Sequence, residues 1–230
     1  MWRSIGLKIS IIIPTLNEQS VIANSLLKLQ PLREAGHEII VIDGGSSDNT
    51  CQIVSPLADK ILITKSGRAN QMNFGAKSAQ HDVLLFLHAD TFLPTNADKM
   101  ISQSLTTKQQ WGRFNVRLSG TAKLLRVVEK MMNWRSCWTG IATGDQAIFV
   151  QRDLYQQVQG FPNIPLMEDI AFSKKLKQFS FPICIKQPVI TSSRRWEENG
   201  IVKTILLMWK LRLAYAFGVS PHKLKDYYML

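Results

Sequence analysis

The first half of the chain alternates between short apolar runs and segments whose apolar residues recur every three or four positions. Short runs of this kind are typical of buried β-strands, and the periodic segments are typical of amphipathic α-helices. The expected strands are residues 8–14, 37–43, 60–64 and 82–89, and the expected helices are residues 17–30, a short segment after the turn at 43–50, and residues 67–79. This order predicts an α/β fold with a mostly parallel sheet flanked by helices on both faces.

After about residue 105 the alternation of strand and helix is no longer regular. We expect an exposed or half-buried strand at 111–118, a strand followed by a helix at 144–161, a strand at 183–191, and helices at 121–135, 167–179 and 201–217. No repeat, linker or low-complexity segment divides the chain, so we predict a single domain over residues 1–230.

Polar clusters follow three of the four strands expected in the first half. They are PTLNE after the first strand, DGGSSD after the second and HADT after the fourth. In parallel α/β sheets, ligands bind beyond the carboxyl ends of the strands. The sequence therefore predicts a ligand site at this edge of the sheet, formed by loops that are far apart in the chain.

Two of these clusters contain an aspartate directly after an apolar strand. Asp43 can cap the glycine–serine turn that follows it, or it can accept an N–H group of a nucleotide base. Asp90 follows LLFLHA, where a carboxylate is costly to bury without a partner. Mg²⁺ and Mn²⁺ usually bind through one or two carboxylates and the phosphates of a substrate. We therefore favour a divalent cation at Asp90 over the alternative that Asp90 caps a helix beginning near Pro94.

A second acidic pair, Glu168–Asp169, opens an expected helix directly after the apolar loop FPNIPLM. A carboxylate beside an apolar wall can act as a general base, because burial raises its pKa. The alternative is that the pair only interacts favourably with the helix dipole. Arg68, Arg194 and Arg195 are candidates for contacts with phosphate, which guanidinium groups bind in a bidentate manner, although any one of them can be an ordinary surface residue.

The charge of the chain is unevenly distributed. The formal net charge is +11, but residues 1–107 contain nine Lys and Arg against nine Asp and Glu, so the excess lies in residues 108–230. This asymmetry indicates an anionic partner, either a nucleic acid or an anionic membrane surface, unless it serves only to keep the surface solvated. No nucleic-acid-binding module is recognisable, so we expect no nucleic acid partner.

Two of the expected helices, 121–135 and 201–217, are basic and rich in large apolar residues. In the first, one apolar face would be formed by Leu124, Leu125, Val128, Met131 and Met132. Tryptophans lie in or near both helices, at positions 134, 138, 196 and 209. This composition fits a surface that rests on anionic lipid, and it fits ordinary packing of both helices against the sheet equally well.

Cysteine use and hydropathy indicate a cytoplasmic protein. Cys51, Cys137 and Cys184 are odd in number and far apart, as expected for reduced thiols rather than for a disulfide framework or a zinc site. No stretch approaches the ~18 unbroken apolar residues of a membrane span. Peripheral attachment to the inner face of the cell membrane stays open as an alternative.

Together and in this order, the motifs resemble those of the family 2 glycosyltransferases, which are inverting enzymes with the GT-A fold. IIIPTLNE is similar to the first strand and nucleotide-binding loop of that family, VIDGGSSDNT to its base-binding segment, GRANQMNFGA to the helix along the diphosphate, HAD to its metal-binding D-x-D, and MEDIAF to the segment of the catalytic base. GDQAIF, PLMEDI and SSRRWEENG together resemble a compact bacterial subgroup. The resemblance covers nearly the whole chain, and the set is more specific than any single motif.

The resemblance implies roles for individual residues and a division of the domain into a nucleotide-binding half, about 1–105, and an acceptor-side half, about 106–230. Asp169 would be the catalytic base, with Glu168 beside it, and Asp90 would hold Mg²⁺ or Mn²⁺ on the diphosphate of the donor. The implied donor-binding positions are Pro14, Thr15, Asn17, Glu18, Asp43, Gly45, Arg68, Asn73, His88, Ala89 and Asp90. The implied acceptor-side positions are Asp145, Gln146, Arg195 and Trp196.

The implied reaction moves a sugar from a nucleotide-diphosphate sugar, with a UDP-sugar favoured, to an acceptor hydroxyl; a lipid acceptor would suit the two basic helices. Two departures from the family's pattern matter. His88 stands where the first aspartate of D-x-D usually stands, and we expect it to be a packed or hydrogen-bonding residue rather than a metal ligand. Ser192 replaces the glutamine of the processive Q-x-x-R-W motif, so we expect transfer of a single sugar.

Two other functions stay open. A nucleotidyltransferase would need a glycine-rich, basic loop near the N-terminus, where this chain has PTLNE. A non-catalytic or weakly active nucleotide-sugar-binding protein is suggested by His88, but the presence of Asp43, Asp90 and Asp169 together argues against it.

Overall fold

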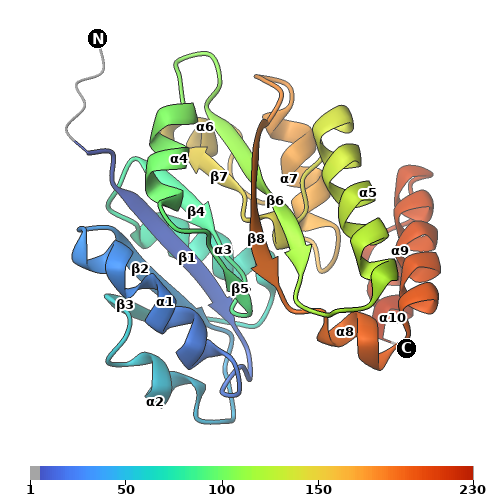
Figure 1. Cartoon of the computed structure of the whole chain (residues 1–230), viewed down its shortest axis with the longest axis horizontal. Helices are drawn as coiled ribbons and strands as arrows, with labels where there is room; N and C mark the ends of the chain where they lie inside the picture. The colour runs from blue at the N-terminus through green and yellow to red at the C-terminus, as the bar shows by residue number, and fades with distance from the viewer. Residues whose placement is uncertain (1–5, 230) are drawn as a thin grey trace.

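The computed structural model describes residues 6–229, and a single eight-stranded sheet forms its centre. The strand order is β3-β2-β1-β4-β7-β6-β8-β5. The strands are β1 (Ile9–Thr15), β2 (Glu38–Asp43), β3 (Lys60–Ile63), β4 (Val83–Phe86), β5 (Thr91–Phe92), β6 (Trp111–Leu118), β7 (Phe149–Gln151) and β8 (Ile183–Thr191). Figure 1 shows the twisted sheet with helices on both sides of it.

Ten α-helices and one 3₁₀ turn are described. They are α1 (Ile22–Glu34), α2 (Thr50–Val54), α3 (Arg68–Ser78), α4 (Ala97–Ser104), α5 (Lys123–Thr139), η1 (Gly144–Gln146), α6 (Arg152–Gln157), α7 (Glu168–Leu176), α8 (Arg194–Glu198), α9 (Ile201–Ala216) and α10 (Pro221–Met229). Within residues 6–229, no helix has both the length and the apolar character that crossing a membrane requires.

The first half forms the predicted parallel sheet. Strands β3, β2, β1 and β4 all run in the same direction. Their side chains alternate between two buried layers: Ile11 and Ile13 of β1 pack with Leu26 of α1, whereas Ile12 packs with Met72 of α3. Because helices cover both faces, every position of these central strands can be apolar, and this explains the continuous apolar runs in the sequence.

The second half of the sheet is mixed. β7 is antiparallel to β4, β6 is antiparallel to β7, and β8 is parallel to β6. The two-residue strand β5 pairs with the end of β8, and the hydroxyl of Thr91 donates to that of Thr191 at 2.9 Å. This pairing, which local pattern did not reveal, holds the HADT loop against the segment that follows β8.

The expectation that residues 111–118 form an exposed or half-buried strand was wrong. β6 lies between β7 and β8 and is covered by α5, so Trp111, Arg113 and Phe114 are fully buried. Arg113 can be buried because its guanidinium donates to the carbonyl of Asn133 at 2.8 Å and also to the Asn115 side chain. The polar residue in the alternating sequence pattern of 111–118 was therefore not a sign of exposure, because Arg113 is buried and hydrogen-bonded.

Two helix expectations also need correction. α1 begins at Ile22, five residues later than predicted, because residues 17–21 form a turn in which Asn17 has a φ of 55°. In α5, Leu125 and Val128 are buried, but Leu124 and Met131, which we placed on the same face, are exposed. The helix packs on a narrower stripe than its apolar residues suggest.

Candidate functional site

A cleft of about 610 Å³ opens at the carboxyl ends of β1 and β4. The start of α3 and the start of α7 form its sides, and α9 and α10 bound it at one end. The predicted site residues that line it are Pro14, Thr15, Glu18, Arg68, His88, Ala89, Asp90, Asp145, Glu168, Asp169, Arg195 and Trp196. The loops after β1 and β4 therefore meet here as expected, whereas the DGGSSD loop after β2 contributes no residue to the lining.

Asp43 lies behind the lining of this cleft and organises the loop that follows β2. Its carboxylate accepts the backbone N–H groups of Gly45 at 2.8 Å and Ser46 at 2.7 Å, and the hydroxyl of Thr15 at 3.3 Å. Burial acts to raise the pKa of Asp43, but these hydrogen bonds outweigh it and lower the pKa. Gly45 has a φ of +91°, a conformation that favours glycine.

The loops after β1 and β2 interlock. The N–H of Asn17 donates to the Ser46 hydroxyl at 2.9 Å, and the N–H of Ser47 donates to the Asn17 side chain at 2.9 Å. The side chain of Gln71 in α3 joins the ends of β1 and β2, because it donates to the carbonyls of Thr15 and Ile42, both at 2.8 Å. Two motifs that looked independent in the sequence form one rigid unit, in which Asn17 supports the loop from behind the cleft lining.

Two predicted site residues lie away from the cleft. Asn73 bonds the N–H and the C=O of Phe161 at 2.9 and 2.8 Å and accepts the Tyr155 hydroxyl at 2.6 Å, so it joins α3 to the segment before α7. Gln146 is fully buried and donates to the Ser136 hydroxyl at 2.9 Å. Both side chains have all their polar atoms engaged in positioning the chain, and neither is directed at a ligand.

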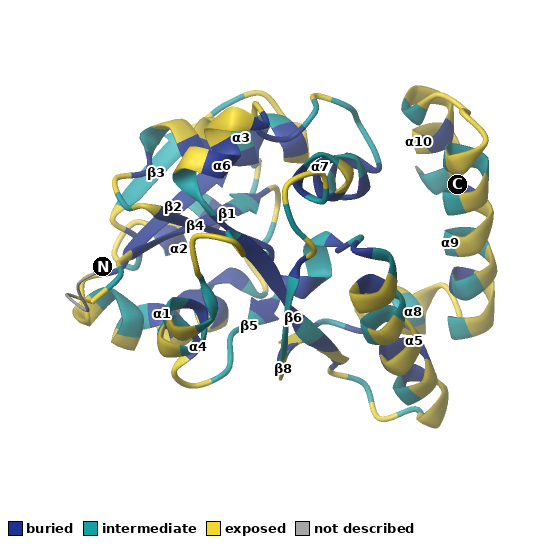
Figure 2. Cartoon of the chain, turned by 90° about the horizontal axis from the view of Figure 1, so that it is seen from above, coloured by how far each residue is buried: buried dark blue, intermediate teal, exposed yellow. Residues whose placement is uncertain are grey.

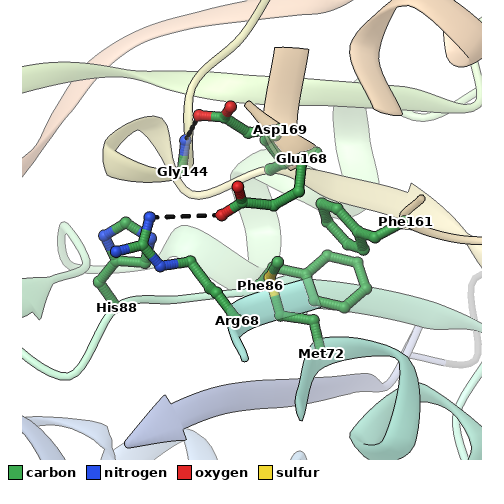
Figure 3. Close-up of a pocket in the computed structure, with 9 residues that line it drawn as sticks. Arg68, Met72, Phe86, His88, Gly144, Phe161, Glu168 and Asp169 are labelled. Atoms are coloured by element: carbon green, nitrogen blue, oxygen red, sulfur yellow. Dashed lines mark hydrogen bonds and ion pairs between the residues drawn. The ribbon is translucent and has the colours of Figure 1, made fainter. Parts of the chain in front are cut away.

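Glu168 and Arg68 form an ion pair at the centre of the cleft (Figure 3). The Arg68 Nη1 to Glu168 Oε1 distance is 3.3 Å, and the Glu168 side chain is 4% exposed, compared with 47% for Arg68. Burial, and then the negative charge of Asp169, raise the pKa of Glu168. Phe86 and Phe161 supply the apolar wall that desolvates this carboxyl.

Asp169 is held in one orientation by backbone donors. Its Oδ2 accepts the N–H of Gly144 at 2.9 Å, and its Oδ1 accepts the N–H of Ile170 at 2.7 Å. Gly144 belongs to η1, so the bond ties the start of α7 to a segment 25 residues earlier in the chain (Figure 3). Each carboxylate oxygen keeps a further lone pair for a ligand on the cleft side.

His88 packs against the same segment. Its Nδ1 lies 3.3 Å from Asp145 Oδ1, and its buried Nε2 has no hydrogen-bond partner among the described residues. A Cβ on Gly144 would overlap Nε2, so only glycine allows the ring to take this place. Burial acts to raise the pKa of Asp145, but the hydrogen bond and charge of His88 outweigh it and lower the pKa.

The chain matches a family of known function. The family model described as "Glycosyl transferase family 2" matches residues 10–109, which include the interlocked loops and Asp90. The match covers less than half of the chain and shows a similarity to this family over residues 10–109. The poly-beta-1,6-N-acetyl-D-glucosamine synthase of Staphylococcus epidermidis is 24% identical to the chain over 238 residues, covering 96% of the chain and 56% of the relative. The chain therefore spans little more than half the length of the curated relatives it matches.

Solved structures of other proteins share the fold of the chain. S. aureus TarS in complex with UDP superimposes with a TM-score of 0.64 at 19% identity, over 81% of this chain and 60% of TarS. The mannosyltransferase PcManGT of Pyrobaculum calidifontis, in complex with GDP-Man and Mn²⁺, superimposes with a TM-score of 0.62 at 18% identity, over 82% of this chain and 57% of PcManGT. The predicted GT-A fold is confirmed.

Few side chains of the cleft could hold a cation. Asp90 lines the cleft, and within residues 6–229 its carboxylate accepts only the Thr91 hydroxyl, at 3.5 Å. Glu18 lines the cleft as well, and its pKa is raised by burial and by the negative charge of Asp90. In the described part of the chain, no three His, Cys, Asp or Glu residues gather into a self-sufficient metal site. An under-coordinated carboxylate of this kind fits a cation that takes its other ligands from a diphosphate.

The C-terminal helices contribute cleft residues that the motifs did not identify. They come from α9 and α10 and are Thr204, Met208, Leu211, Arg212, Lys225 and Tyr228. The spacing of Thr204, Met208 and Leu211 is that of one helix face, so helical periodicity could have grouped them. Burial lowers the pKa of Arg212. The sequence contained no signal that this face, rather than another, would turn to the cleft.

Proposed function

We propose that the chain transfers a sugar from a nucleoside-diphosphate sugar, with a UDP-sugar favoured, to an acceptor hydroxyl with inversion at the anomeric carbon. The observation that carries the proposal is the convergence of Asp90, Arg68 and Asp169 on one cleft at the carboxyl ends of β1 and β4. The names of the similar proteins support it: a poly-beta-1,6-N-acetyl-D-glucosamine synthase, and TarS in complex with UDP and with UDP-GlcNAc.

The donor would lie across the interlocked loops. Asp43 would act through the backbone it holds, fixing the loop against which the base rests. One guanidinium nitrogen of Arg68, Nη1, pairs with Glu168, and the other N–H groups of this exposed side chain would donate to the diphosphate. Because Glu168 holds the guanidinium in place before the donor arrives, the positive charge of Arg68 that would face the leaving nucleoside diphosphate is preorganised, which is the usual source of large electrostatic rate effects.

Asp90 would hold a divalent cation, Mg²⁺ or Mn²⁺, together with oxygens of the donor diphosphate. When bound, such a cation neutralises charge that develops on the departing diphosphate. Three of the similar solved structures contain Mn²⁺, one of them with GDP-Man and two with UDP. Glu18 lies at the same end of the cleft and adds a second carboxylate to the surroundings of Asp90.

Asp169 would be the general base. As the acceptor oxygen forms its bond to the anomeric carbon, the bond from that carbon to the diphosphate oxygen breaks, and the acceptor proton passes to Asp169. The backbone bonds from Gly144 and Ile170 hold the carboxylate still, so it needs no reorientation during the reaction. Attack from the face opposite the leaving group gives inversion.

The acceptor end of the cleft combines apolar and cationic side chains. Leu166, Met208 and Leu211 are apolar, and Arg195 and Arg212 carry positive charge. This combination favours an acceptor with an apolar part next to an anionic group, such as a lipid-linked acceptor. Ser192, in place of the glutamine of Q-x-x-R-W, supports transfer of one sugar per binding event. The name of the S. epidermidis relative supports a glycan acceptor as the second candidate.

The proposal is tested with purified protein and a panel of UDP-sugars and GDP-sugars, each with and without Mn²⁺ or Mg²⁺. We expect one donor to raise the melting temperature and to release nucleoside diphosphate, slowly with water and faster with an acceptor. Asp169→Asn should bind that donor but turn over at least about a hundredfold more slowly. The exposed Asp153→Asn on α6 is the matched control and should behave like the unmodified protein.

Three results would count against the proposal. Donor binding without any turnover would indicate a nucleotide-sugar-binding protein. Release of pyrophosphate from a nucleoside triphosphate and a sugar phosphate would indicate a nucleotidyltransferase. Equal loss of activity in Asp153→Asn and Asp169→Asn would show that the effect of Asp169→Asn is not specific to the cleft.

A further inference from the structure

Helix α5 carries a continuous apolar stripe that faces solvent. Its members are Leu124, Val127, Met131, Trp134 and Trp138, all of them large and more than a third exposed. They recur at intervals of three and four residues, which places them on one side of the helix. Trp134 and Trp138 stack with their ring centroids 5.5 Å apart and their planes 12° apart, and their side chains remain 66% and 71% exposed. The faces of these rings form a flat apolar surface, and its exposure to water is unfavourable.

Helix α9 carries a second stripe of the same kind. Its members are Val202, Leu206, Trp209 and Leu213, continued by Phe217 just beyond the end of the helix. Phe217 is 82% exposed and Trp209 is 62% exposed. The two helices are neighbours, because Leu125 and Val128 of α5 pack in one cluster with Ile201 and Ile205 at the start of α9.

Both stripes lie at the end of the molecule that is remote from the parallel strands. Figure 2 shows α5 and α9 at this end, with their exposed residues on the outward sides. Monomeric proteins rarely expose large contiguous apolar surfaces unless something covers them in the functional state. Exposed apolar residues elsewhere, such as Leu27 and Ile63, stand alone on their elements.

The charges beside the stripes indicate what covers them. The exposed charged residues of α5 and α9 are lysines: Lys123, Lys130, Lys203 and Lys210. The sole acidic residue of the two helices is Glu129, which is buried, bonded to the Leu118 N–H and paired with Arg126 at 2.9 Å. On these two helices the apolar stripes are therefore accompanied by exposed cations and by no exposed anion. This charge pattern is complementary to a surface with an apolar interior and negatively charged groups at its boundary with water.

We propose that the exposed faces of α5 and α9 dock on an anionic lipid bilayer, with both helices lying flat in the headgroup region. The four lysines would contact lipid phosphates, and Trp134, Trp138, Trp209 and Phe217 would insert between the acyl chains. A second copy of this chain would bring the same lysines together across the interface, which is unfavourable.

Docking in this way would bring the bilayer close to the acceptor end of the cleft. One face of α9 carries Trp209 and Leu213, and the opposite face carries Thr204, Met208 and Leu211 into the cleft. A lipid-linked acceptor in the docked bilayer would therefore lie one helix diameter from the site. This last step rests on the proposed glycosyl transfer, whereas the docking itself does not.

The docking is tested by co-sedimentation of the full chain with vesicles of phosphatidylcholine alone and of phosphatidylcholine with phosphatidylglycerol, in the absence of any donor. We expect binding to the vesicles containing phosphatidylglycerol, weakened by added salt because screening shortens the reach of the lysine charges. Brominated acyl chains should quench the tryptophan fluorescence of the unmodified protein on binding, and this readout needs no variant.

Paired variants separate the two contributions. Trp134→Ala with Trp138→Ala should weaken vesicle binding about tenfold or more, because two aromatic side chains no longer insert. Lys203→Glu with Lys210→Glu should weaken it by at least about 30-fold. The matched controls are Leu27→Ala and the pair Lys99→Glu with Lys108→Glu, which are exposed on other parts of the surface and should bind as the unmodified chain does.

Four outcomes would overturn the docking proposal: no binding by the unmodified chain, equal binding to neutral vesicles, equal losses in the control variants, or a dimer in light scattering that the tryptophan variants abolish. All readouts are independent of turnover. A protein that binds vesicles but transfers no sugar would refute the proposed function and leave the docking surface intact.

Discussion

Helices in two regions of the molecule have the same kind of amphipathic pattern but differ in how far their apolar residues are buried. One region is the set of parallel strands β1–β4 with its helices, and the other is the pair α5 and α9. In α1, the residues buried on the sheet are Ile22, Ser25, Leu26 and Leu29, and Leu27 alone among its large apolar residues is strongly exposed. Of the Val, Leu, Ile, Met and Trp residues, five of eight are exposed in α5 and four of nine in α9. Amphipathicity thus predicts a helix in both regions, but burial depends on whether a second layer is present to receive the apolar face.

The two regions also differ in how they hold the cleft. On the side of β1 and β2, backbone and side-chain bonds join the loops to each other, as with Asn17 and Ser46. On the side of α7 and α9, single bonds such as Gly144 to Asp169 position charged groups that face the ligand. We infer that changes in the first region act mainly through stability and changes in the second act mainly through turnover or surface binding. The predictions below test this division.

The largest effect is expected for Asp169→Asn. The amide keeps the size of the side chain but cannot take the acceptor proton, so kcat should fall about 10³-fold. The melting temperature should stay within a few degrees of that of the unmodified protein. Steady-state assays with the identified donor check the rate, and calorimetry checks the stability. A large stability loss in this variant would break the proposed division between the two regions.

Asp90→Ala should lower turnover about a hundredfold or more, because the divalent cation loses its protein carboxylate. The apparent Mn²⁺ requirement should rise, and high Mn²⁺ should restore part of the rate. A titration of turnover against Mn²⁺ concentration measures this. Identical titration curves for the variant and the unmodified protein would remove Asp90 from the cation site.

Gly75→Ala should destabilise the parallel half by about 1–3 kcal/mol, because overpacking a dense core is costly. A Cβ at position 75 would lie 2.5 Å from Ile42 Cδ1 and 2.7 Å from Ile12 Cγ2, which are side chains of the central strands. Urea unfolding gives the free energy. Phe74→Ala, on the exposed side of the same helix, is the control and should change the free energy of unfolding much less than Gly75→Ala does.

Asp43→Asn should lower the free energy of unfolding by about 2 kcal/mol at neutral pH, because a carboxylate that accepts several hydrogen bonds is exchanged for a weaker acceptor. The folded pKa of Asp43 is lowered from 3.8, so its contribution is fully present above that pH and is lost as the pH falls through the folded pKa. Urea unfolding at pH 7 and at pH 3 should therefore show a smaller difference between the two proteins at the lower pH. An equal difference at both would show that the charge is not the cause.

The smallest effect is expected for Trp138→Ala. This side chain is 71% exposed, so its loss should change the free energy of unfolding by less than about 0.5 kcal/mol. Sugar transfer to a soluble acceptor should be unchanged. If Trp138→Ala destabilises the protein as much as Gly75→Ala does, the exposed stripe of α5 contributes to the fold and the contrast between the two regions fails.

Much of the fold and part of the site followed from local pattern. The four parallel strands and three helices of the first half were predicted within a few residues, because each buried strand is short and uniformly apolar and each helix has one clear apolar face. Asp90, Arg68 and Asp169 were recognisable because they stand directly at the ends of such elements. The supporting roles of Asn73 and Gln146 were not, because the partners that bind them, Phe161 and Ser136, are distant or irregularly spaced in the chain.

Local sequence was thus enough for the parallel strands β1 to β4, for the helices α1 to α3 between them and for the edge of the sheet where the cleft opens, since these depend on periodicity and on the nature of a βαβ connection. Only the packed chain decided that β5 pairs with β8, that Gly144 anchors Asp169, and that α9 turns Met208 toward the cleft and Trp209 toward solvent. The physical reason is that a helix or strand often has more than one side that could pack against the rest of the protein. Which side is buried depends on neighbouring elements that are distant in the sequence and come together only when the whole sheet has formed.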